Sequence, residues 1–276
     1  MSQLSEPAAV AAQYRRSDNF DARVRIYRLY ATTRPTWLEW LFEQIGLADG
    51  ERILEVGCGT ANLWIENARR IPDSARIVLS DLSPGMLETA RERLGNAAGR
   101  VELLRFDVCE IPYPDASFDR VIANHMLYHV ADRARALSEI ARVLAPDGRC
   151  HAGTNDWTHQ IEIRELVERF GVESTMMRVG REEAIFDLQT AAKELSARFD
   201  RVEVARRHDH LYVTDAEVLG DYVRSACPAT AENLARIQRL QDAVTEEIER
   251  LGSFHLTVAA GVCHARAPRT QAAAGS

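Results

Sequence analysis

Short apolar runs alternate with helical segments between residues 51 and 150, and this alternation is the feature that most constrains the fold. Each run has the length and composition of a buried strand, and the segment after it carries apolar residues at helical spacing. Strands that are joined through helices in this order form a parallel sheet with helices on both faces. The sequence therefore predicts a doubly wound, Rossmann-like α/β fold.

The expected elements follow from that alternation. Ser83-Pro84 marks one helix start, because Ser is a good N-cap and Pro favours the first helical position. Two amphipathic helices are expected within 18–47, ahead of the sheet, and His208–His210 is expected in an exposed turn. The expected strands are 52–56, 75–80, 101–106, 118–123, 149–153, 201–206 and 254–263, with a strand-like stretch at 211–214; the expected later helices are 61–70, 84–94, 133–144, 159–170, 182–199, 215–225 and 230–251.

We therefore expect one domain: a mostly parallel seven-stranded sheet with an antiparallel last strand, N-terminal helices and a helical cap insertion. Its expected parts are an N-terminal helical lid at 13–48, a ligand-binding core at 50–155, core completion and cap at 156–253, and a flexible tail at 267–276.

Composition and charge narrow the function classes. The formal charge is −7 and no block of Lys and Arg forms a footprint for phosphate backbones, so nucleic acid is a disfavoured partner. No run approaches the roughly 18 apolar residues of a membrane span, and no secretion signal is recognisable, which predicts a cytoplasmic protein without membrane contact. The five cysteines stand singly, which predicts reduced thiols and no metal site.

Gly57 and Gly59 lie in the first strand-to-helix turn, within Glu55-Val56-Gly57-Cys58-Gly59-Thr60-Ala61. In an open α/β sheet this turn is where the backbone comes closest to a ligand, and a side chain there would block the approach. A nicotinamide dehydrogenase would need a third glycine at position 62, which is Asn62. A nicotinamide oxidoreductase is therefore a weaker prediction.

Acidic residues follow the next two strands. Asp81 ends the second strand, where its carboxylate can accept both hydroxyls of a ribose or cap a helix. Asp107-Val108 ends the third strand, where an acidic acceptor beside an apolar side chain can hold a purine. The pattern indicates a nucleoside-containing ligand at the carboxyl edge of the sheet.

Four motifs in order carry a resemblance to a known family: ILEVGCGTANL (53–63), VLSDLSPGML (78–87), RFDVCEIPYPDASFDRVIANHMLYHV (105–130) and ARVLAPDGR (141–149). They resemble the small-molecule branch of the class I S-adenosylmethionine-dependent methyltransferases. The resemblance implies S-adenosyl-L-methionine as cofactor. It places Glu55, Gly57, Gly59 and Asn124 at the methionine end of the cofactor, with Asn124 also at the sulfonium. It places Asp81 at the ribose. Leu82 and Met86 are then expected at the adenosine, and Asp107 and Val108 at the adenine. It also suggests Tyr14 and Arg23 as lid residues over the cofactor, with Arg23 at the methionine carboxylate or in solvent.

Candidate catalytic residues follow the fourth and fifth strands. Methyl transfer is an in-line displacement, so alignment supplies much of the catalysis and a base is needed only if the acceptor must lose a proton. His125 follows Asn124 and faces the pocket or the core; Asp156 and His159 are candidate bases, while Asp156 can also cap a helix.

The expected activity is methylation of O, N or C of a small-molecule acceptor. The alternatives are a methyltransferase that acts on RNA or protein and a non-catalytic module that binds S-adenosylmethionine. The acceptor is not readable from the sequence, and a homodimer is left open.

Overall fold

The structure, a computed structural model, describes residues 18–174 and 186–268 of the chain. These residues form two compact units. Unit 1 comprises residues 18–34, 157–174 and 207–259, and unit 2 comprises residues 35–156, 186–206 and 260–268.

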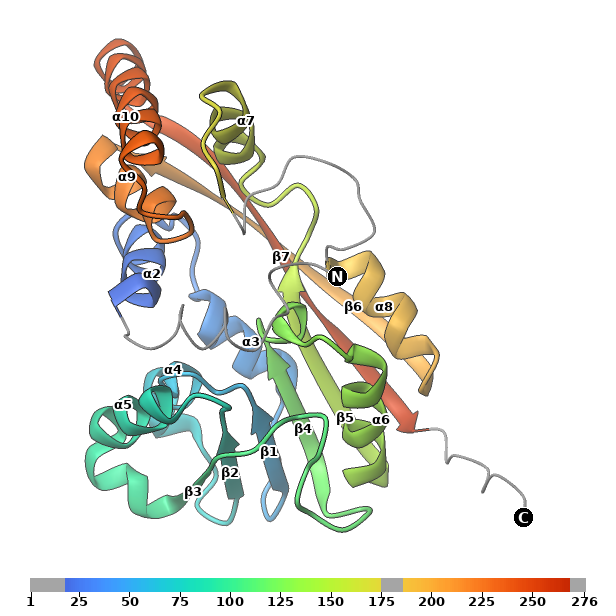
Figure 1. Ribbon diagram of the computed structural model, residues 1–276. Coiled ribbons are helices and arrows are strands. Elements are labelled where there is room, and N and C mark those ends of the chain that lie inside the picture. The colour runs from blue at the N-terminus through green and yellow to red at the C-terminus, as the bar shows by residue number, and fades with distance from the viewer. Residues whose placement is uncertain (1–17, 175–185, 269–276) are drawn as a thin grey trace. The chain divides into compact units, whose positions relative to one another are not determined.

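A seven-stranded sheet in the order β3-β2-β1-β4-β5-β7-β6 organises the fold (Figure 1). The pairs β1–β2, β1–β4, β2–β3 and β4–β5 are parallel, and β7 is antiparallel to β5. The predicted doubly wound sheet with an antiparallel last strand is therefore confirmed. The strands are β1 (Arg52–Val56), β2 (Arg76–Ser80), β3 (Val101–Leu104), β4 (Phe118–Asn124), β5 (Leu144–Asn155), β6 (Phe199–Val213) and β7 (Phe254–Pro268).

In unit 2, helices cover both faces of the sheet. Alternate residues of a strand point to opposite faces, so Ile53 packs with α3, α4 and α5, whereas Leu54 packs with α6 and α8. The helices of this unit are α3 (Trp37–Ile45), α4 (Asn62–Glu66), α5 (Pro84–Leu94), α6 (Arg133–Val143) and α8 (Leu188–Ser196), with short 3-10 turns at Ala68–Arg70, Gly95–Arg100 and Leu127–His129.

Unit 1 has its own apolar core. It is built from α2 (Asp18–Tyr30), α7 (Ile161–Arg169), α9 (Ala216–Arg224) and α10 (Ala231–Leu251). Ile26 of α2 and Leu240 of α10 are completely buried in this core, together with Leu211 of β6 and Leu256 of β7. None of the helices in the described ranges is long and apolar enough to cross a membrane.

Several element boundaries differ from the predicted ones. β3 ends at Leu104 rather than at Phe106, α4 ends at Glu66, and β5 is longer than expected, from Leu144 to Asn155. The predicted helix at 182–199 lies partly outside the described residues, and α8 begins at Leu188 after the N-cap Asp187.

The prediction of a turn at His208–His210 is wrong, because these residues lie inside the single strand β6. Asp209, Leu211 and Val213 are buried while the residues between them are exposed, which is the period of a strand with one covered face. Asp209 hides this alternation in the sequence. Its buried carboxylate is satisfied by the Thr32 hydroxyl, which donates to Oδ1 over 2.8 Å.

Arg120 on β4 joins helix α3 to the sheet of unit 2. Its guanidinium is almost completely buried, pairs with Glu51 at 2.9 Å, and donates to the backbone oxygens of Ile45 (2.8 Å) and Gly46 (3.1 Å). These two carbonyls end α3 and have no partner within the helix. One side chain therefore fixes both the end of α3 and the partly buried Glu51 carboxylate.

Removing Arg120 is expected to cost far more than removing an exposed arginine. In Arg120→Ala the Glu51 carboxylate keeps only the N–H of Ala48, and both carbonyls lose the guanidinium, so the free energy of unfolding should fall by about 3 kcal/mol. The control is Arg52→Ala, whose partner Asp119 is 33% exposed, with an expected loss of under about 1 kcal/mol. Urea denaturation measures both, and equal losses would contradict the anchoring role of Arg120.

The buried His151 of β5 and the half-buried His264 of β7 form a pair beside Arg120. Their Nδ1 atoms lie 2.8 Å apart, and His151 Nε2 lies 3.3 Å from Arg120 Nη1. The arginine only donates, so His151 accepts at Nε2 and donates at Nδ1. Burial lowers the pKa of both imidazoles, and the facing cations lower it further.

The stability of the protein is therefore expected to fall in mild acid. Below a pH of about 6.5 the unfolded chain binds protons that the folded His151 and His264 do not, so the free energy of unfolding decreases by up to about 1.4 kcal/mol per pH unit for each group. Urea titrations between pH 8 and pH 5 measure this slope. His151→Gln should flatten it, and the exposed His208→Gln should leave it unchanged; a slope that His151→Gln does not alter would refute the assignment.

Candidate active site

The glycine loop after β1 is held tightly on one side and is open on the other. Gly57 and Gly59 have φ of +65° and +55°, which favours glycine. A Cβ at Gly57 would lie 2.6 Å from Met126 Cβ, so the loop packs directly on the segment after β4. A Cβ at Gly59 would meet nothing within 4 Å. The backbone at Gly59 thus borders open space.

Asp81 is the central acidic group of the site. Its Oδ2 accepts the N–H of Gly59 at 2.9 Å, and its Oδ1 accepts the N–H of Ser83 at 2.8 Å. Burial raises the pKa of Asp81, while these backbone donors oppose the rise. The two bonds fix the plane of the carboxylate and attach the end of β2 to the glycine loop.

Glu55 lies beneath the loop as a second buried carboxyl. It is 2% exposed, and the indole of Trp64 donates to it at 2.5 Å. Burial raises its pKa to about 8, the Trp64 bond lowers it, and the nearby Asp81 charge raises it. A cation bound here would favour the ionised form of both carboxyls.

The predicted adenosine residues surround the end of β2 and the turn after β3. Leu82 is 44% exposed although it is apolar, while Met86 in the first turn of α5 is buried. Asp107 is exposed beside the buried Val108, and its Oδ1 accepts the N–H of Cys109 at 2.9 Å. Because β3 ends at Leu104, Asp107 and Val108 lie in a turn rather than at the strand end.

Asn124 and His125 end β4 next to the glycine loop. The Asn124 Oδ1 accepts the indole N–H of Trp37 at 3.3 Å. His125 has a left-handed φ of +52°, which is unusual for a residue other than glycine, and its N–H donates to Gly153 O at 2.9 Å. Burial lowers the pKa of His125 to about 4, so the imidazole is neutral near pH 7.

The other predicted residues are distributed between the two units. Asp156 lies in unit 2, with a carboxylate oxygen 3.9 Å from Arg206 Nε. His159 and Arg23 lie in unit 1. His159 contacts Tyr27, with 2.9 Å between Nε2 and the phenol oxygen. Tyr14 lies outside the described residues.

Hydrogen bonds assign the tautomer of neutral His159. The N–H of Ala259 donates to Nδ1 at 3.3 Å, so Nε2 carries the proton and donates to Tyr27. Gln160 also donates to the Tyr27 oxygen, at 2.8 Å. The lone pair of His159 is therefore directed at a backbone amide.

Two residues that contact the predicted site residues were not predicted from the sequence. Trp37 and Trp64 contact Asn124 and Glu55, although each stands in an amphipathic helical pattern that indicates core packing. One signal in the sequence could have identified Trp64. It stands in the short helix directly after the glycine loop, within reach of the end of β1.

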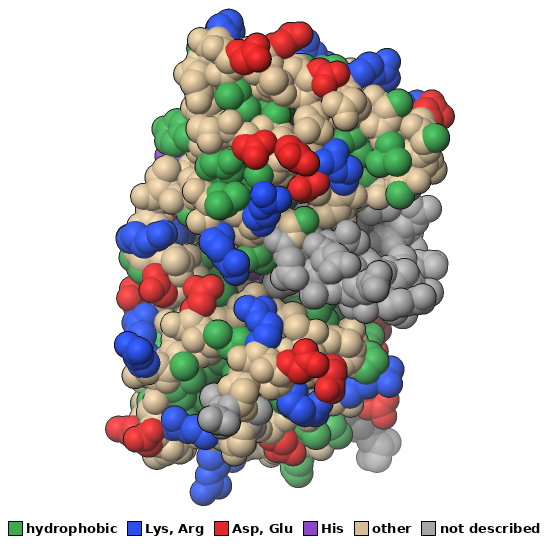
Figure 2. Space-filling view, turned by 90° about the vertical axis from the view of Figure 1, so that its left-hand side faces the viewer, with side chains coloured by type: hydrophobic (Ala, Val, Ile, Leu, Met, Phe, Trp, Pro, Cys, Tyr) green, Lys and Arg blue, Asp and Glu red, His purple; other side chains and the backbone are tan. Residues whose placement is uncertain are grey.

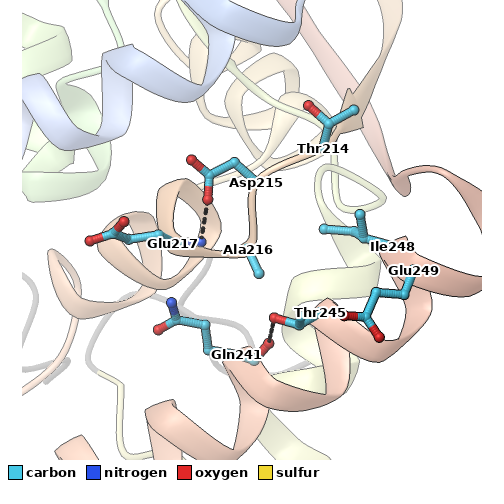
Figure 3. Close-up of a pocket in the computed structure, with 8 residues that line it drawn as sticks. All are labelled: Thr214, Asp215, Ala216, Glu217, Gln241, Thr245, Ile248 and Glu249. Carbon is cyan, nitrogen blue, oxygen red and sulfur yellow. Dashed lines mark hydrogen bonds between the residues drawn. The ribbon is translucent and has the colours of Figure 1, made fainter.

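Unit 1 carries a surface groove of about 330 Å³ along α9 and α10 (Figure 3). Its polar groups mostly serve their own helices: Asp215 caps α9 through the N–H of Glu217, and Thr245 donates to Gln241 O. We assign it no role. The groove is lined by Thr214, Asp215, Ala216, Glu217, Gln241, Thr245, Ile248 and Glu249.

Charges elsewhere are mixed. On the face in Figure 2 the basic and acidic side chains are interspersed rather than gathered by sign. Among the described residues, no three His, Cys, Asp or Glu side chains come together as a metal site.

The residues of unit 2 fit a cationic nucleoside ligand. Open space in front of Gly59 allows close approach to the backbone, Asp81 offers an oriented carboxylate to hydroxyl groups, and the exposed Leu82 offers apolar surface. Glu55 adds a buried carboxyl that a positive charge would stabilise. This donor set matches S-adenosylmethionine, which joins a ribose and an adenine to a cationic sulfonium.

Comparison with known proteins agrees with this geometry. Residues 54–152 match the family described as methyltransferase domain. The ubiquinone/menaquinone biosynthesis C-methyltransferase UbiE of Enterobacter sp. (strain 638) is 33% identical over 115 residues, which cover 41% of this chain and 46% of that protein. The match thus spans less than half the length of this curated relative.

Solved structures share the fold at low identity. The YcgJ protein of Bacillus subtilis superposes with a TM-score of 0.57 at 17% identity, over 82% of this chain and 96% of that one. Phosphoethanolamine N-methyltransferase 2 of Haemonchus contortus, solved with phosphomonomethylethanolamine and S-adenosylhomocysteine, has a TM-score of 0.57 at 18% identity, over 96% of this chain and 61% of that one.

The matched residues 54–152 contain the end of β1 and all of β2, β3 and β4, and with them the glycine loop, Asp81 and Asn124. The resemblance inferred from the four sequence motifs is therefore confirmed over the matched part of the chain: residues 54–152 are a methyltransferase domain of the class I S-adenosylmethionine-dependent type.

Proposed function

We propose that this protein transfers a methyl group from S-adenosylmethionine to an O, N or C atom of a small-molecule acceptor and releases S-adenosylhomocysteine. The observation that carries the proposal is the partly buried Asp81 carboxylate, oriented by the N–H groups of Gly59 and Ser83 beside the open face of Gly59. The name of the Enterobacter relative, a C-methyltransferase of quinone biosynthesis, supports a small acceptor.

Each cofactor-binding residue has a proposed task. Asp81 accepts the ribose hydroxyls, Leu82 and Met86 contact the adenosine, and Asp107 with Val108 contacts the adenine. Glu55, the Gly57–Gly59 backbone and Asn124 contact the methionyl part. Arg23 and Tyr14 belong to the proposed lid, and residues 156–253 supply groups that bind the acceptor.

The chemistry is an in-line displacement. When bound, the cofactor supplies a methyl carbon that its sulfonium has activated. A lone pair of the acceptor forms the new bond to this carbon, while the electrons of the carbon–sulfur bond remain on sulfur. The protein holds the acceptor in line and excludes water, which supplies much of the rate.

His125, Asp156 and His159 are the proposed residues at the reacting end. His125 is neutral, and a pKa of about 4 makes it a weak base, so we assign it to packing and hydrogen bonding beside the methyl group. Asp156 and His159 are the proposed groups that take a proton from an acceptor hydroxyl, amine or carbon acid.

Ligand binding provides the test of the function. S-adenosylmethionine and S-adenosylhomocysteine, but not NAD, should stabilise the protein, by about 2.7 kcal/mol at a hundred times the dissociation constant. Asp81→Asn and Gly59→Ala should each weaken binding more than tenfold in calorimetric titration, because they remove an oriented acceptor or fill the open space.

Two variants control for stability. Gly171→Ala places a Cβ at a glycine with φ +63° and open surroundings, so it carries the same backbone strain as Gly59→Ala. Asp73→Asn alters an exposed carboxylate. Both should bind like the wild type. Stabilisation by NAD alone would exclude the proposed function.

His125→Asn separates turnover from binding. Asn tolerates a left-handed φ, so the fold should be preserved. We expect S-adenosylmethionine to bind within about threefold of the wild type, because ligand contact is assigned to other residues, while methyl transfer falls at least about tenfold. Mass spectrometry of products from cell extract with isotope-labelled cofactor measures the transfer. Full transfer by this variant would remove His125 from the reacting end.

A further inference from the structure

Trp37 contacts the end of β4 from the first turn of α3. The N-cap Thr36 fixes this turn through a capping box, in which its hydroxyl accepts the N–H of Glu39 at 3.2 Å and its own N–H donates to the Glu39 carboxylate at 2.7 Å. Leu41 and Ile45 are completely buried in the core of unit 2 and hold the rest of the helix. The indole is thus attached to a rigid element.

The contact between Trp37 and Asn124 settles the orientation of the Asn124 amide. An indole N–H can only donate, so the atom that faces it at 3.3 Å must be the carboxamide oxygen. The NH2 group of Asn124 is then the part of the side chain that remains for other partners. A bound group that approaches Asn124 therefore meets a donor and must supply an acceptor.

Gly153 on β5 makes this arrangement possible. It pairs with Asn124 across the two strands, and a Cβ at Gly153 would lie 2.7 Å from Asn124 Oδ1 and 3.4 Å from the Trp37 ring. Any larger residue would displace the amide or the indole. The glycine therefore leaves room for the Trp37–Asn124 hydrogen bond.

The same cluster reaches the glycine loop. The rings of Trp37 and His125 lie 5.2 Å apart, and Met126, the next residue, would be 2.6 Å from a Cβ on Gly57. Left-handed backbone at a residue other than glycine is unfavourable and persists where the surroundings hold it in place. The His125 ring contact and its bond to Gly153 supply such surroundings.

From these contacts we propose that Trp37 is a positioning residue of the cofactor site: its indole N–H turns the Asn124 amide so that the NH2 group is presented to the carboxylate of the methionyl part. This inference rests on the proposed function. A carboxylate supplies two acceptor oxygens, and a hydrogen bond to a charged group is stronger than one between neutral groups. Trp37 acts only through Asn124 and need not contact the ligand.

The test is the affinity of the full chain for S-adenosylmethionine and S-adenosylhomocysteine, measured by calorimetry. Trp37→Phe removes the N–H donor and keeps an aromatic ring, and we expect about tenfold weaker binding of both ligands, because both carry the carboxylate. Trp40→Phe, in the same helix, is the matched control and should bind like the wild type. A loss limited to the cationic S-adenosylmethionine would overturn the assignment to the carboxylate.

A double-mutant cycle separates positioning from general damage. If Trp37 acts through Asn124, Trp37→Phe should have no further effect on affinity in an Asn124→Ala background. An equal loss in both backgrounds, or wild-type affinity in Trp37→Phe, would overturn the proposal.

A second variant guards against poor folding of Trp37→Phe. Gly153→Ala disturbs the same hydrogen bond from β5 while the indole is intact, and it should reproduce the loss of affinity; wild-type affinity in Gly153→Ala would count against the proposal. If the wild-type protein binds neither ligand, the proposed function fails first. Wild-type binding with unaffected variants rejects the role of Trp37 alone.

Discussion

The hydrogen bond from Gly59 N–H to Asp81 is the interaction on which the rest of the site depends. It connects the loop after β1 to the end of β2, two strands that are parallel neighbours in the sheet. Parallel strands present their carboxyl ends at one edge, so a short bond there joins residues 22 positions apart in sequence. The bond also gives a partner to a buried carboxylate that would otherwise be costly to hold as an anion.

Much of the fold was predictable because the parallel strands are buried on both faces and therefore appear as short apolar runs. The bounds of β1 and α5 agree with the sequence analysis residue for residue. The predicted turn was wrong where a strand carries polar residues on one face: β6 continues through His208–His210, and the buried Asp209 has a tertiary partner in Thr32. Local sequence does not contain that partner.

The candidate site also contains residues that could be predicted from the sequence and residues that could not. The positions of Gly57, Gly59 and Asp81 were predictable because they follow from backbone geometry at a sheet edge. Trp37 was not, since its contact with Asn124 joins positions 87 apart and depends on the room left by Gly153. An aromatic residue at helical spacing is usually core, and only the structure distinguishes an indole whose N–H is engaged at a functional edge.

The three proposed groups at the reacting end have different surroundings. Burial holds the pKa of His125 at about 4, the lone pair of His159 is directed at the N–H of Ala259, and Asp156 lies beside the cation of Arg206. The imidazole of His125 is therefore a weak base. Displacement at a sulfonium-activated carbon needs a nucleophile in line more than a strong base. A neutral His125 therefore fits alignment better than proton transfer, which leaves the proposed uptake of an acceptor proton to Asp156 and His159.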